Sequence, residues 1–265
     1  ATRQWFWALV GLACVGLSAT WGQAQVSVNL ALDDPAYALL DKLVHSQLTF
    51  TKALTIKPIT RLYAARLIAE ALERRQHDLE TGQRQEAFID ETLQYLTSRF
   101  KRELQQIGFL YSPRRPASTV LAPLTELKLD TVFAKDPYVH RDSSGLTPTL
   151  QGVFGLQEGF VPGKNFSLRT RSVSWATLGE YGAAYLEPEV LVRSHPLLGD
   201  RLEAGLYKGY AKGGYANLEL AFGRDTLWWG PASQGDLVLS NNAPPLELVK
   251  VSTPAPFRLP WAYSD

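Results

Sequence analysis

The sequence predicts a mainly β protein: an antiparallel outer-membrane β-barrel, present in part, preceded by a small N-terminal α-helical bundle. First, the hydrophobic period changes from 3.6 residues to 2 after about residue 121. Second, the alternating segments are each near or above the roughly 10 residues of a tilted transmembrane strand. Third, the chain begins with an export signal. The 265 residues contain no methionine and stop after a proline-rich stretch. We therefore expect a fragment of a longer protein, with the C-terminal strands missing.

Residues 1–24 have the pattern of a secretory signal peptide. Arg3 gives a positive start, Phe6 to Ala19 is apolar, and Gly22-Gln23-Ala24 supplies small residues for cleavage. The apolar run is shorter than the roughly 18 residues of a membrane-spanning helix, although a retained N-terminal anchor is an alternative. The only cysteine, Cys14, lies inside this segment, so a disulfide-stapled fold is excluded for the exported chain.

The pattern of residues 25–111 predicts a small soluble helical bundle, for which the family resemblance described below implies a periplasmic location. Asp33-Asp34-Pro35 is a helix start with an acidic cap and a first-turn proline. A second helix is predicted from about Pro58 to Gln76, preceded by Thr55 or Lys57. A third is predicted from about Gln83 to Gln106 and ends at Gly108. The apolar face of this third helix comprises Phe88, Leu93, Leu96, Phe100, Leu104 and Ile107.

Residues 112–121 read as a linker, and residues 122–265 as the N-terminal part of the barrel. From Glu126 to Phe133, apolar and charged residues alternate, and Asn165 to Arg171 follows the same rule. In Tyr215 to Asp225, leucines and Phe222 oppose polar positions such as Glu219. Further strands are predicted over 149–160, 179–193 and 201–210, which gives about six, fewer than the eight of the smallest bacterial barrels.

A soluble β-sandwich is the alternative architecture. Charges on the inward-alternating face, namely Arg169, Arg171 and Glu219, favour the barrel, because a sandwich would bury them in its core. Aromatic residues near strand ends also favour it, as an interfacial girdle requires. These aromatic residues are Tyr181, Tyr185, Tyr207, Tyr210 and Trp228.

Three segments resemble the Wzi family of capsule-assembly proteins of Gram-negative outer membranes. The first is residues 36–43 with 56–61, the second is the β-rich chain from Leu124 onward, and the third is the most specific. It comprises Gly223-Arg224-Asp225, Trp228-Trp229-Gly230-Pro231 and Leu239-Ser240-Asn241-Asn242-Ala243-Pro244. The resemblance implies a large antiparallel barrel with a helical bundle on its periplasmic side. It also implies a non-enzymatic, lectin-like role in holding capsular polysaccharide at the cell surface.

Candidate polysaccharide-binding residues are aromatic or polar side chains in the β-rich part. Trp228 and Trp229 can stack on sugar rings, although neighbours on a strand point to opposite faces and either can instead fill the interior or anchor at the interface. Four polar residues can hydrogen-bond saccharide hydroxyls: Arg224, Asp225, Asn241 and Asn242. Alternatively, the first two form an ion pair and the asparagines hold a turn. Arg169 and Arg171 share a strand face and can attract acidic sugars, or simply line a charged lumen.

Other functions find less support in the sequence. A net charge of +1 gives no electrostatic case for nucleic acid. The four histidines have no metal-ligand spacing, and no cofactor-binding motif is present. Carboxylate pairs such as Asp225 with Asp236, or Glu187 with Glu189, occur in any β protein, so we expect no enzyme. Residues 57–61 mark the entry to a helix, and they are interpreted either as a structural helix cap or as a cell-wall contact. The resemblance to the Wzi family implies capsular polysaccharide as a partner, and the barrel pattern implies outer-membrane lipid. A carbohydrate-permeable porin is the alternative.

Overall fold

A long antiparallel sheet dominates the structure. The computed structural model describes residues 26–51, 53–81, 87–112, 119–134, 138–141, 148–151, 164–195, 199–215, 217–230 and 244–253. The sheet has six strands in the order β10-β8-β7-β6-β5-β2. They are β2 (Val120–Ala134), β5 (Lys164–Leu178), β6 (Gly182–His195), β7 (Gly199–Tyr215), β8 (Leu218–Asp225) and β10 (Leu246–Ser252). Among the described residues, β2 and β10 are the two edges of this sheet.

The predicted strands are present, and several are longer than the sequence indicated. The strand predicted over 165–171 extends to 164–178, and that over 201–210 extends to 199–215. The strand predicted over 149–160 was only partly right: β4 (Pro148–Gln151) pairs with β3 (Tyr138–Arg141), and residues 152–163 lie outside the described part. Strand β10 was not predicted. The mainly antiparallel β class is thus confirmed.

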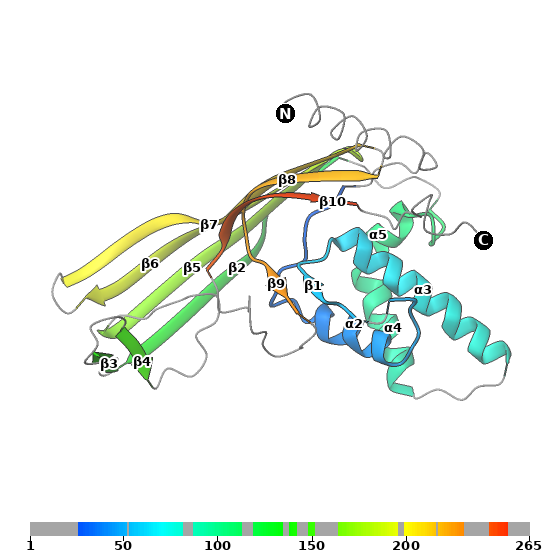
Figure 1. Ribbon diagram of the computed structural model, residues 1–265, viewed down its shortest axis with the longest axis horizontal. Helices are drawn as coiled ribbons and strands as arrows, with labels where there is room; N and C mark the ends of the chain where they lie inside the picture. Colours follow the sequence, from blue (N-terminus) through cyan, green and yellow to red (C-terminus); the bar gives the residue numbers. More distant parts are fainter. Residues whose placement is uncertain are drawn as a thin grey trace, which may run out of the picture.

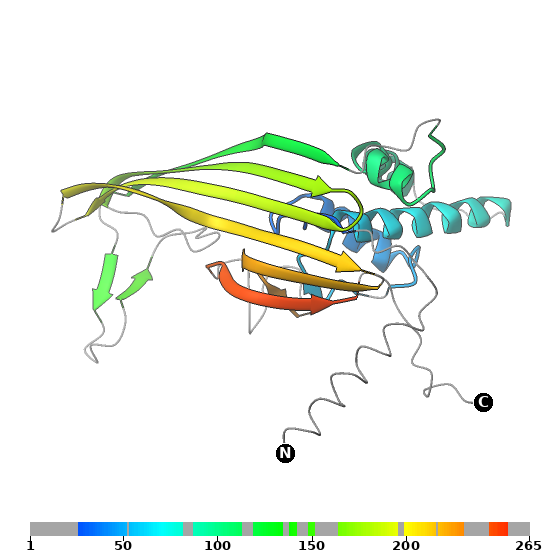
Figure 2. The same cartoon turned by 90° about the horizontal axis from the view of Figure 1, so that it is seen from above.

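Four helices lie at one end of the sheet, opposite the β3–β4 pair (Figures 1 and 2). They are α2 (Ala36–His45), α3 (Arg61–Glu80), α4 (Ala87–Arg99) and α5 (Lys101–Gln106). Their shared core contains Leu40, Leu43, Leu67, Ile68, Leu96, Phe100 and Leu104, each at most 1% exposed. The helices therefore have a dry core separate from the face of the sheet. No helix among the described residues is long and apolar enough to cross a lipid bilayer.

The helix ends correct two predictions. The predicted start of the second helix was wrong, because Thr60 is its N-cap: the Thr60 side chain accepts a hydrogen bond from Tyr63 N at 3.1 Å. The predicted third helix is divided at Phe100, whose ψ of 18° departs from helical geometry. Gly108 ends it as predicted, with a positive φ of 79°.

One residue of the predicted apolar helix face lies on the surface. Phe88 is 43% exposed, and the Lys42 ammonium lies 4.3 Å from its ring centroid. A cation over an aromatic face is favourable at an exposed site. The helical period grouped Phe88 with the buried residues, but in the first turn of α4 it is the neighbouring Ile89 that enters the core.

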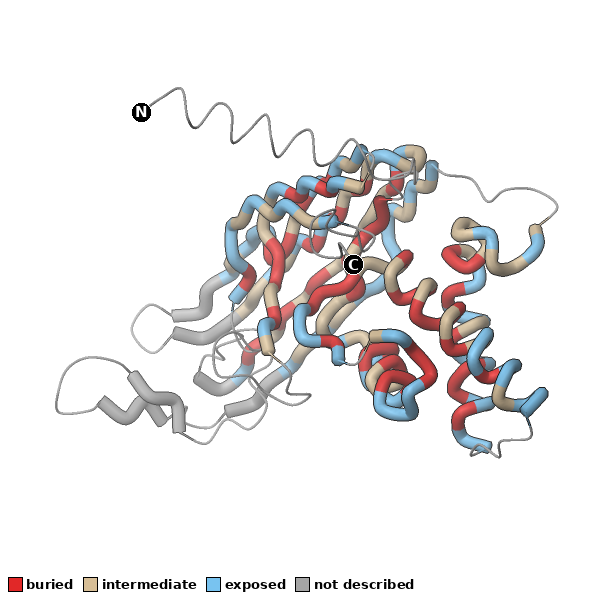
Figure 3. Tube along the Cα trace, turned by 45° about the vertical axis from the view of Figure 1, so that its right-hand side comes forward, coloured by how far each residue is buried: buried red, intermediate tan, exposed pale blue. Residues whose placement is uncertain are grey.

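The two faces of the sheet differ in polarity. One face, called here the outer face, exposes apolar side chains: Leu127, Leu129, Phe166, Leu186, Val190, Leu202, Leu218, Leu220, Phe222, Val249 and Val251. The other, called the inner face, buries charged ones: Arg169, Arg171, Glu187, Lys208, Lys212, Glu219 and Asp225. Figure 3 shows the resulting alternation of buried and exposed residues along the strands. The period-2 pattern read from the sequence is confirmed.

Strand β8 leaves the sheet after Asp225, and the chain turns to the inner side. There β9 (Trp228–Trp229) pairs with β1 (Ile56–Lys57), which precedes α3. Gly223 permits the close approach of β8 to β7: its φ is 137°, and a Cβ at this position would lie 2.3 Å from the carbonyl oxygen of Gly209. The β1–β9 ribbon links the sheet to the helices (Figure 1).

The remaining fold predictions lie beyond the described structure. The proposed signal peptide, residues 1–24, lies outside the described residues, as does most of the predicted linker at 112–121. The structure therefore fixes an antiparallel sheet with accompanying helices, and the closure of that sheet into a barrel stays a prediction.

Candidate functional site

The candidate site is the inner face of the sheet together with residues 26–34, called here the N-terminal segment. This segment runs between the sheet and the helices. Its backbone pairs with the chain entering α3, because Leu30 N donates to Ile59 O at 2.9 Å and Arg61 N to Val28 O at 3.0 Å. Toward the sheet, Val26 N donates to Glu180 O at 2.9 Å. The segment is thus fixed on both sides.

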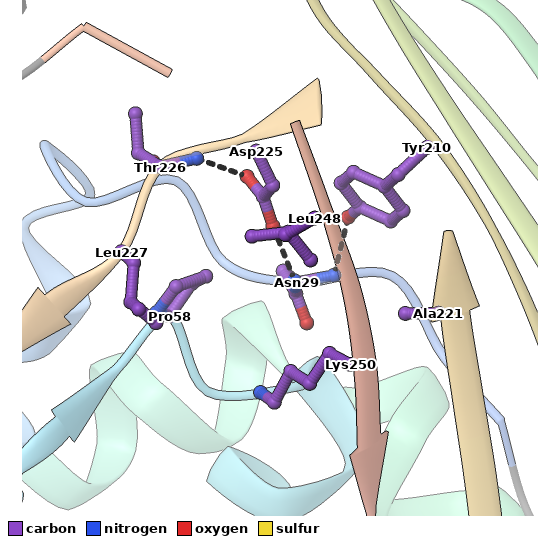
Figure 4. A pocket seen from close by; sticks show the side chains of 9 residues that line it. All are labelled: Asn29, Pro58, Tyr210, Ala221, Asp225, Thr226, Leu227, Leu248 and Lys250. Atoms are coloured by element: carbon purple, nitrogen blue, oxygen red, sulfur yellow. Dashed lines mark hydrogen bonds between the residues drawn. The ribbon is translucent and has the colours of Figure 1, made fainter. Parts of the chain in front are cut away.

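Asn29 joins the N-terminal segment to the sheet through three hydrogen bonds. Its backbone N donates to the Tyr210 hydroxyl at 2.8 Å. Its Nδ2 donates to Asp225 Oδ2 at 2.8 Å, and its Oδ1 accepts from Lys212 Nζ at 2.5 Å. Figure 4 shows Asn29, Tyr210 and Asp225 turned toward one another around a small pocket that Pro58 and Lys250 help to line. One amide side chain therefore joins a buried carboxylate and a buried ammonium.

The charged side chains that bond to Asn29 also have other hydrogen-bond and ion-pair partners. Asp225 Oδ1 accepts from Thr226 N at 2.8 Å, and Lys212 Nζ lies 3.2 Å from Glu219 Oε1. Lys212 and Glu219 are nearly fully buried. A buried charge pair persists only when its remaining hydrogen bonds are made. This end of the inner face is therefore a closed polar network and holds little capacity for a further charged ligand.

A second charged cluster, formed by Arg169 and Arg171, lies farther along the inner face. Both guanidinium groups contact Asp130, at 2.8 and 3.3 Å, and Arg171 also lies 3.2 Å from Glu187 Oε1. The guanidinium carbon of Arg171 stands 4.8 Å from the ring centroid of Tyr207. The prediction that the two arginines share a face is confirmed. Their charges are largely balanced by the adjacent carboxylates.

Two stacked tyrosines connect the clusters. The rings of Tyr185 and Tyr210 are parallel, with centroids 5.2 Å apart. The Tyr185 hydroxyl donates to Glu187 Oε2 at 2.9 Å, and the Tyr210 hydroxyl accepts from Asn29. The inner face therefore carries one continuous polar and aromatic belt from β2 to β8.

The N-terminal segment also forms an ion pair near its end. Lys128 Nζ lies 2.5 Å from Asp33 Oδ2. Partial burial by itself raises the pKa of Asp33, but the charge and hydrogen bond of Lys128 outweigh it and hold that pKa below its ordinary value. Asp33 is therefore ionised at neutral pH and ties the segment to β2.

The two adjacent tryptophans have different surroundings, as the alternation of a strand requires. Trp228 is 8% exposed and lies beside Lys57, whose ammonium stands 5.6 Å from its ring centroid and 3.3 Å from Asp41 Oδ2. Trp229 is 59% exposed and stands opposite Ile56 across the ribbon. Trp228 is thus buried against Lys57 of β1, while Trp229 is largely exposed.

The structure separates two predicted site residues that are neighbours in sequence. Asp225 points to the inner face, whereas Arg224 lies on the outer face and donates from Nη1 to Leu206 O at 3.2 Å. The alternative that these two form an ion pair is wrong, because successive residues of β8 face opposite sides. Asn241, Asn242 and Asp236 lie outside the described residues.

Sequence analysis missed the residues that hold the site together. Asn29 carried no periodic or motif signal, because its role depends on partners about 180 positions away. The segment 57–61 was assigned to a helix cap or a cell-wall contact; the cap is confirmed at Thr60, but the burial of Lys57 beside Trp228 was not foreseen. Tyr185, Tyr207, Tyr210 and Trp228 were predicted to lie in an interfacial girdle, but all four are buried, so this prediction was wrong for them. By contrast, Lys208 and Lys212 could have been found by extending the period-2 pattern along β7.

Metal binding finds no support in the described part of the chain, where no group of three or more His, Cys, Asp or Glu side chains is arranged to hold an ion. Glu187, nominated in a carboxylate pair, is engaged by Arg171 and Tyr185.

Comparison with known proteins gives one assignment. The family model described as Capsule assembly protein Wzi matches residues 135–264, which include β5 to β10 and the Trp228–Trp229 pair. Searches of curated proteins and of solved structures found no match.

Proposed function

We propose that this chain is a Wzi-family capsule assembly protein, as the family model that matches residues 135–264 indicates, and that it is a non-enzymatic outer-membrane protein that binds capsular polysaccharide and helps attach it to the cell. The observation that carries this proposal is the polarity of the sheet. Apolar side chains cover the exposed outer face, and charged side chains lie on the buried inner face. A water-soluble sandwich has the opposite arrangement, whereas a barrel in lipid needs this one.

The outer face supports contact with lipid. Leu202 and Phe222 are 73% and 68% exposed, and many neighbours of the same face are apolar and exposed. Soluble proteins rarely expose an apolar patch that extends over so many strands. Residues 122–265 are accordingly proposed as part of a transmembrane barrel, whose further strands would pair with the edges of β2 and β10.

The connections between strands support an orientation. At the helical end, β5 joins β6 through residues 179–181 and β7 joins β8 through residues 216–217, so both connections are short. At the other end, β2 joins β5 through residues 135–163, which include the β3–β4 pair. Outer-membrane barrels have short periplasmic turns and longer extracellular loops. The helices, residues 25–111, are therefore proposed as periplasmic, after removal of a signal peptide at 1–24, with a linker at 112–121.

Trp229 is the best-supported sugar contact among the candidate residues. Its indole is exposed on the β1–β9 ribbon, and a tryptophan side chain has only two rotatable bonds, so little side-chain freedom is lost on binding. Arg169 and Arg171 are a weaker choice, because Asp130 and Glu187 already balance their charge. Many weak contacts along a repeating polymer would give avidity without one tight site.

A carbohydrate-permeable porin is the second candidate, and the charged inner face favours it. The position of the N-terminal segment argues against an open pore, because Asn29 and Asp33 bond across the inner face. Single-channel conductance in a planar bilayer separates the two functions. A steady open conductance would support the porin; its absence would support the polysaccharide-binding protein.

The test is retention of capsule by living cells. Deletion of the gene should shift polysaccharide from the cell-bound to the shed fraction, and the wild-type gene should restore it. Trp229→Ala should restore retention only in part while the protein remains folded. Phe50→Ala is the matched control, since Phe50 is 79% exposed but lies away from the ribbon. Unchanged retention in the deletion strain would refute the proposed function.

The neighbouring tryptophan gives a contrasting result. Trp228 is buried, so Trp228→Ala should lower the free energy of unfolding by about 3–5 kcal/mol. Trp229→Ala should change it by no more than about 1 kcal/mol. Urea denaturation of the two purified variants measures this difference, and equal losses would show that Trp229 is structural.

A further inference from the structure

A lysine is buried where the β1–β9 ribbon meets helix α2. Lys57 is only 6% exposed, although a lysine side chain is almost never fully buried unless it has a partner. In the antiparallel register of the ribbon, Lys57 stands opposite Trp228. Burial of its ammonium requires groups that replace the lost water, and these groups come from two separate elements.

The Lys57 ammonium lies among a carboxylate and two aromatic rings. Its nitrogen is 3.3 Å from Asp41 Oδ2 and 5.0 Å from the ring centroid of Tyr37, both on α2. The ring centroid of Trp228, on β9, lies 5.6 Å from the same nitrogen. A carboxylate and the face of an aromatic ring each attract a cation. The ammonium therefore joins the ribbon to the helix.

The helix side of this contact is firmly held. Tyr37 is 5% exposed, and its hydroxyl accepts from Ile59 N at 3.0 Å and donates to Leu30 O at 3.4 Å. Leu40 and Leu43, on the same helix, lie in the helical core and are each 1% exposed. The groups that surround the ammonium thus belong to an element fixed by its own packing.

The ribbon by itself is too short to hold its shape. Strands β1 and β9 have two residues each, and an isolated pair of strands is at best marginally stable. One further backbone hydrogen bond, from Gly230 N to Thr55 O at 2.9 Å, extends the pairing. Ile56 and Trp229 are register partners on the face opposite Lys57, and both are exposed. The position of the exposed indole therefore depends on how the other face is held.

We propose that Lys57, held by Asp41, is the positioning residue for the sugar contact of Trp229. It acts through the ribbon: the ammonium fixes one face to α2, and the opposite face then presents the indole in one orientation. This inference rests on the proposed function, in which Trp229 contacts capsular polysaccharide. A ribbon released from α2 would have to become ordered when sugar binds, and that loss of conformational freedom would weaken binding.

The experiment measures two quantities on the purified protein in detergent. One is the Kd for capsular polysaccharide isolated from the strain that carries the gene, by isothermal titration calorimetry. The other is hydrogen exchange of the Gly230 amide, by NMR. Lys57→Met keeps the length of the side chain and removes the ammonium. It should raise the Kd roughly tenfold and speed Gly230 exchange by a similar factor. The Gly214 amide, which donates to Tyr181 O at 2.8 Å in the large sheet, should exchange as in the wild type.

Three more variants separate positioning from a general loss of stability. Lys57→Arg keeps the cation and should restore most of the binding and of the Gly230 protection. Asp41→Asn removes the carboxylate and should reproduce part of the effect of Lys57→Met. Lys42→Met is the matched control, because Lys42 is an exposed lysine next to Asp41 on α2, and it should change neither quantity.

A double variant tests whether Lys57 acts through Trp229. Lys57→Met combined with Trp229→Ala should bind no more weakly than Trp229→Ala alone, because the indole to be positioned is already absent. Additive losses, full binding by Trp229→Ala, or unchanged Gly230 exchange in Lys57→Met would each overturn the positioning role. Failure of the wild type to bind the polysaccharide would contradict the proposed function itself, whereas the positioning role fails with wild-type binding intact.

Discussion

Replacing Asn29 by alanine should detach the N-terminal segment from the inner face of the sheet. The substitution removes the hydrogen bonds from Nδ2 to Asp225 at 2.8 Å and from Lys212 to Oδ1 at 2.5 Å. Hydrogen bonds to charged groups contribute about 1.5–3 kcal/mol each. Asp225 keeps its bond from Thr226 N, and Lys212 keeps Glu219, which reduces the loss. We expect the free energy of unfolding to fall by about 3 kcal/mol.

The measurement is urea denaturation of the purified protein in detergent, followed by tryptophan fluorescence, with the midpoint and slope compared with the wild type. Gln94→Ala is the matched control, since Gln94 is exposed on α4 and should cost no more than about 0.5 kcal/mol. The double variant with Asp225→Ala should lose less than the sum of the two single losses, because both act on one bond. A loss for Asn29→Ala no larger than that of the control would refute the assigned role of Asn29.

Two further outcomes follow from the close approach of β8 to β7 and from the ion pair on β2. Gly223→Ala should lower the free energy of unfolding by at least about 2 kcal/mol. The added Cβ would lie 2.3 Å from the carbonyl oxygen of Gly209, and the φ of 137° strains any L residue. The control is Gly205→Ala, where a Cβ meets nothing within 4 Å, and it should be nearly neutral in the same urea experiment. The pKa of Asp33 is lower in the folded protein, so its stabilisation is present above its ordinary pKa and is lost as the pH falls below about 4. Asp33→Asn should therefore be less stable than the wild type at pH 6, and the difference should shrink as the pH falls below about 4. A difference that stays constant as the solution is acidified would contradict this role of the Asp33–Lys128 pair.

Local patterns predicted those parts of the fold that depend on short sequence distances. The start at Asp34-Pro35, the stop at Gly108 and the alternation along β8 each follow from residues within a few positions of one another. The alternation also contained the answer for Arg224, since it stands in the same row as Phe222. The sequence analysis treated Arg224 and Asp225 as one polar motif. This was a mistake, because the two-residue period of a strand places neighbouring residues on opposite faces.

The sequence by itself determined the antiparallel β class, the helical first part, and which side chains of each strand lie together, because these depend on repeating backbone geometry. Only the tertiary structure decided that Asn29 reaches Asp225 and Lys212, that Trp228 is buried while Trp229 is exposed, and that β1 pairs with β9. These contacts join residues about 170 to 200 positions apart. No local propensity encodes such pairings, since they form only when the sheet and the helices bury their surfaces against each other.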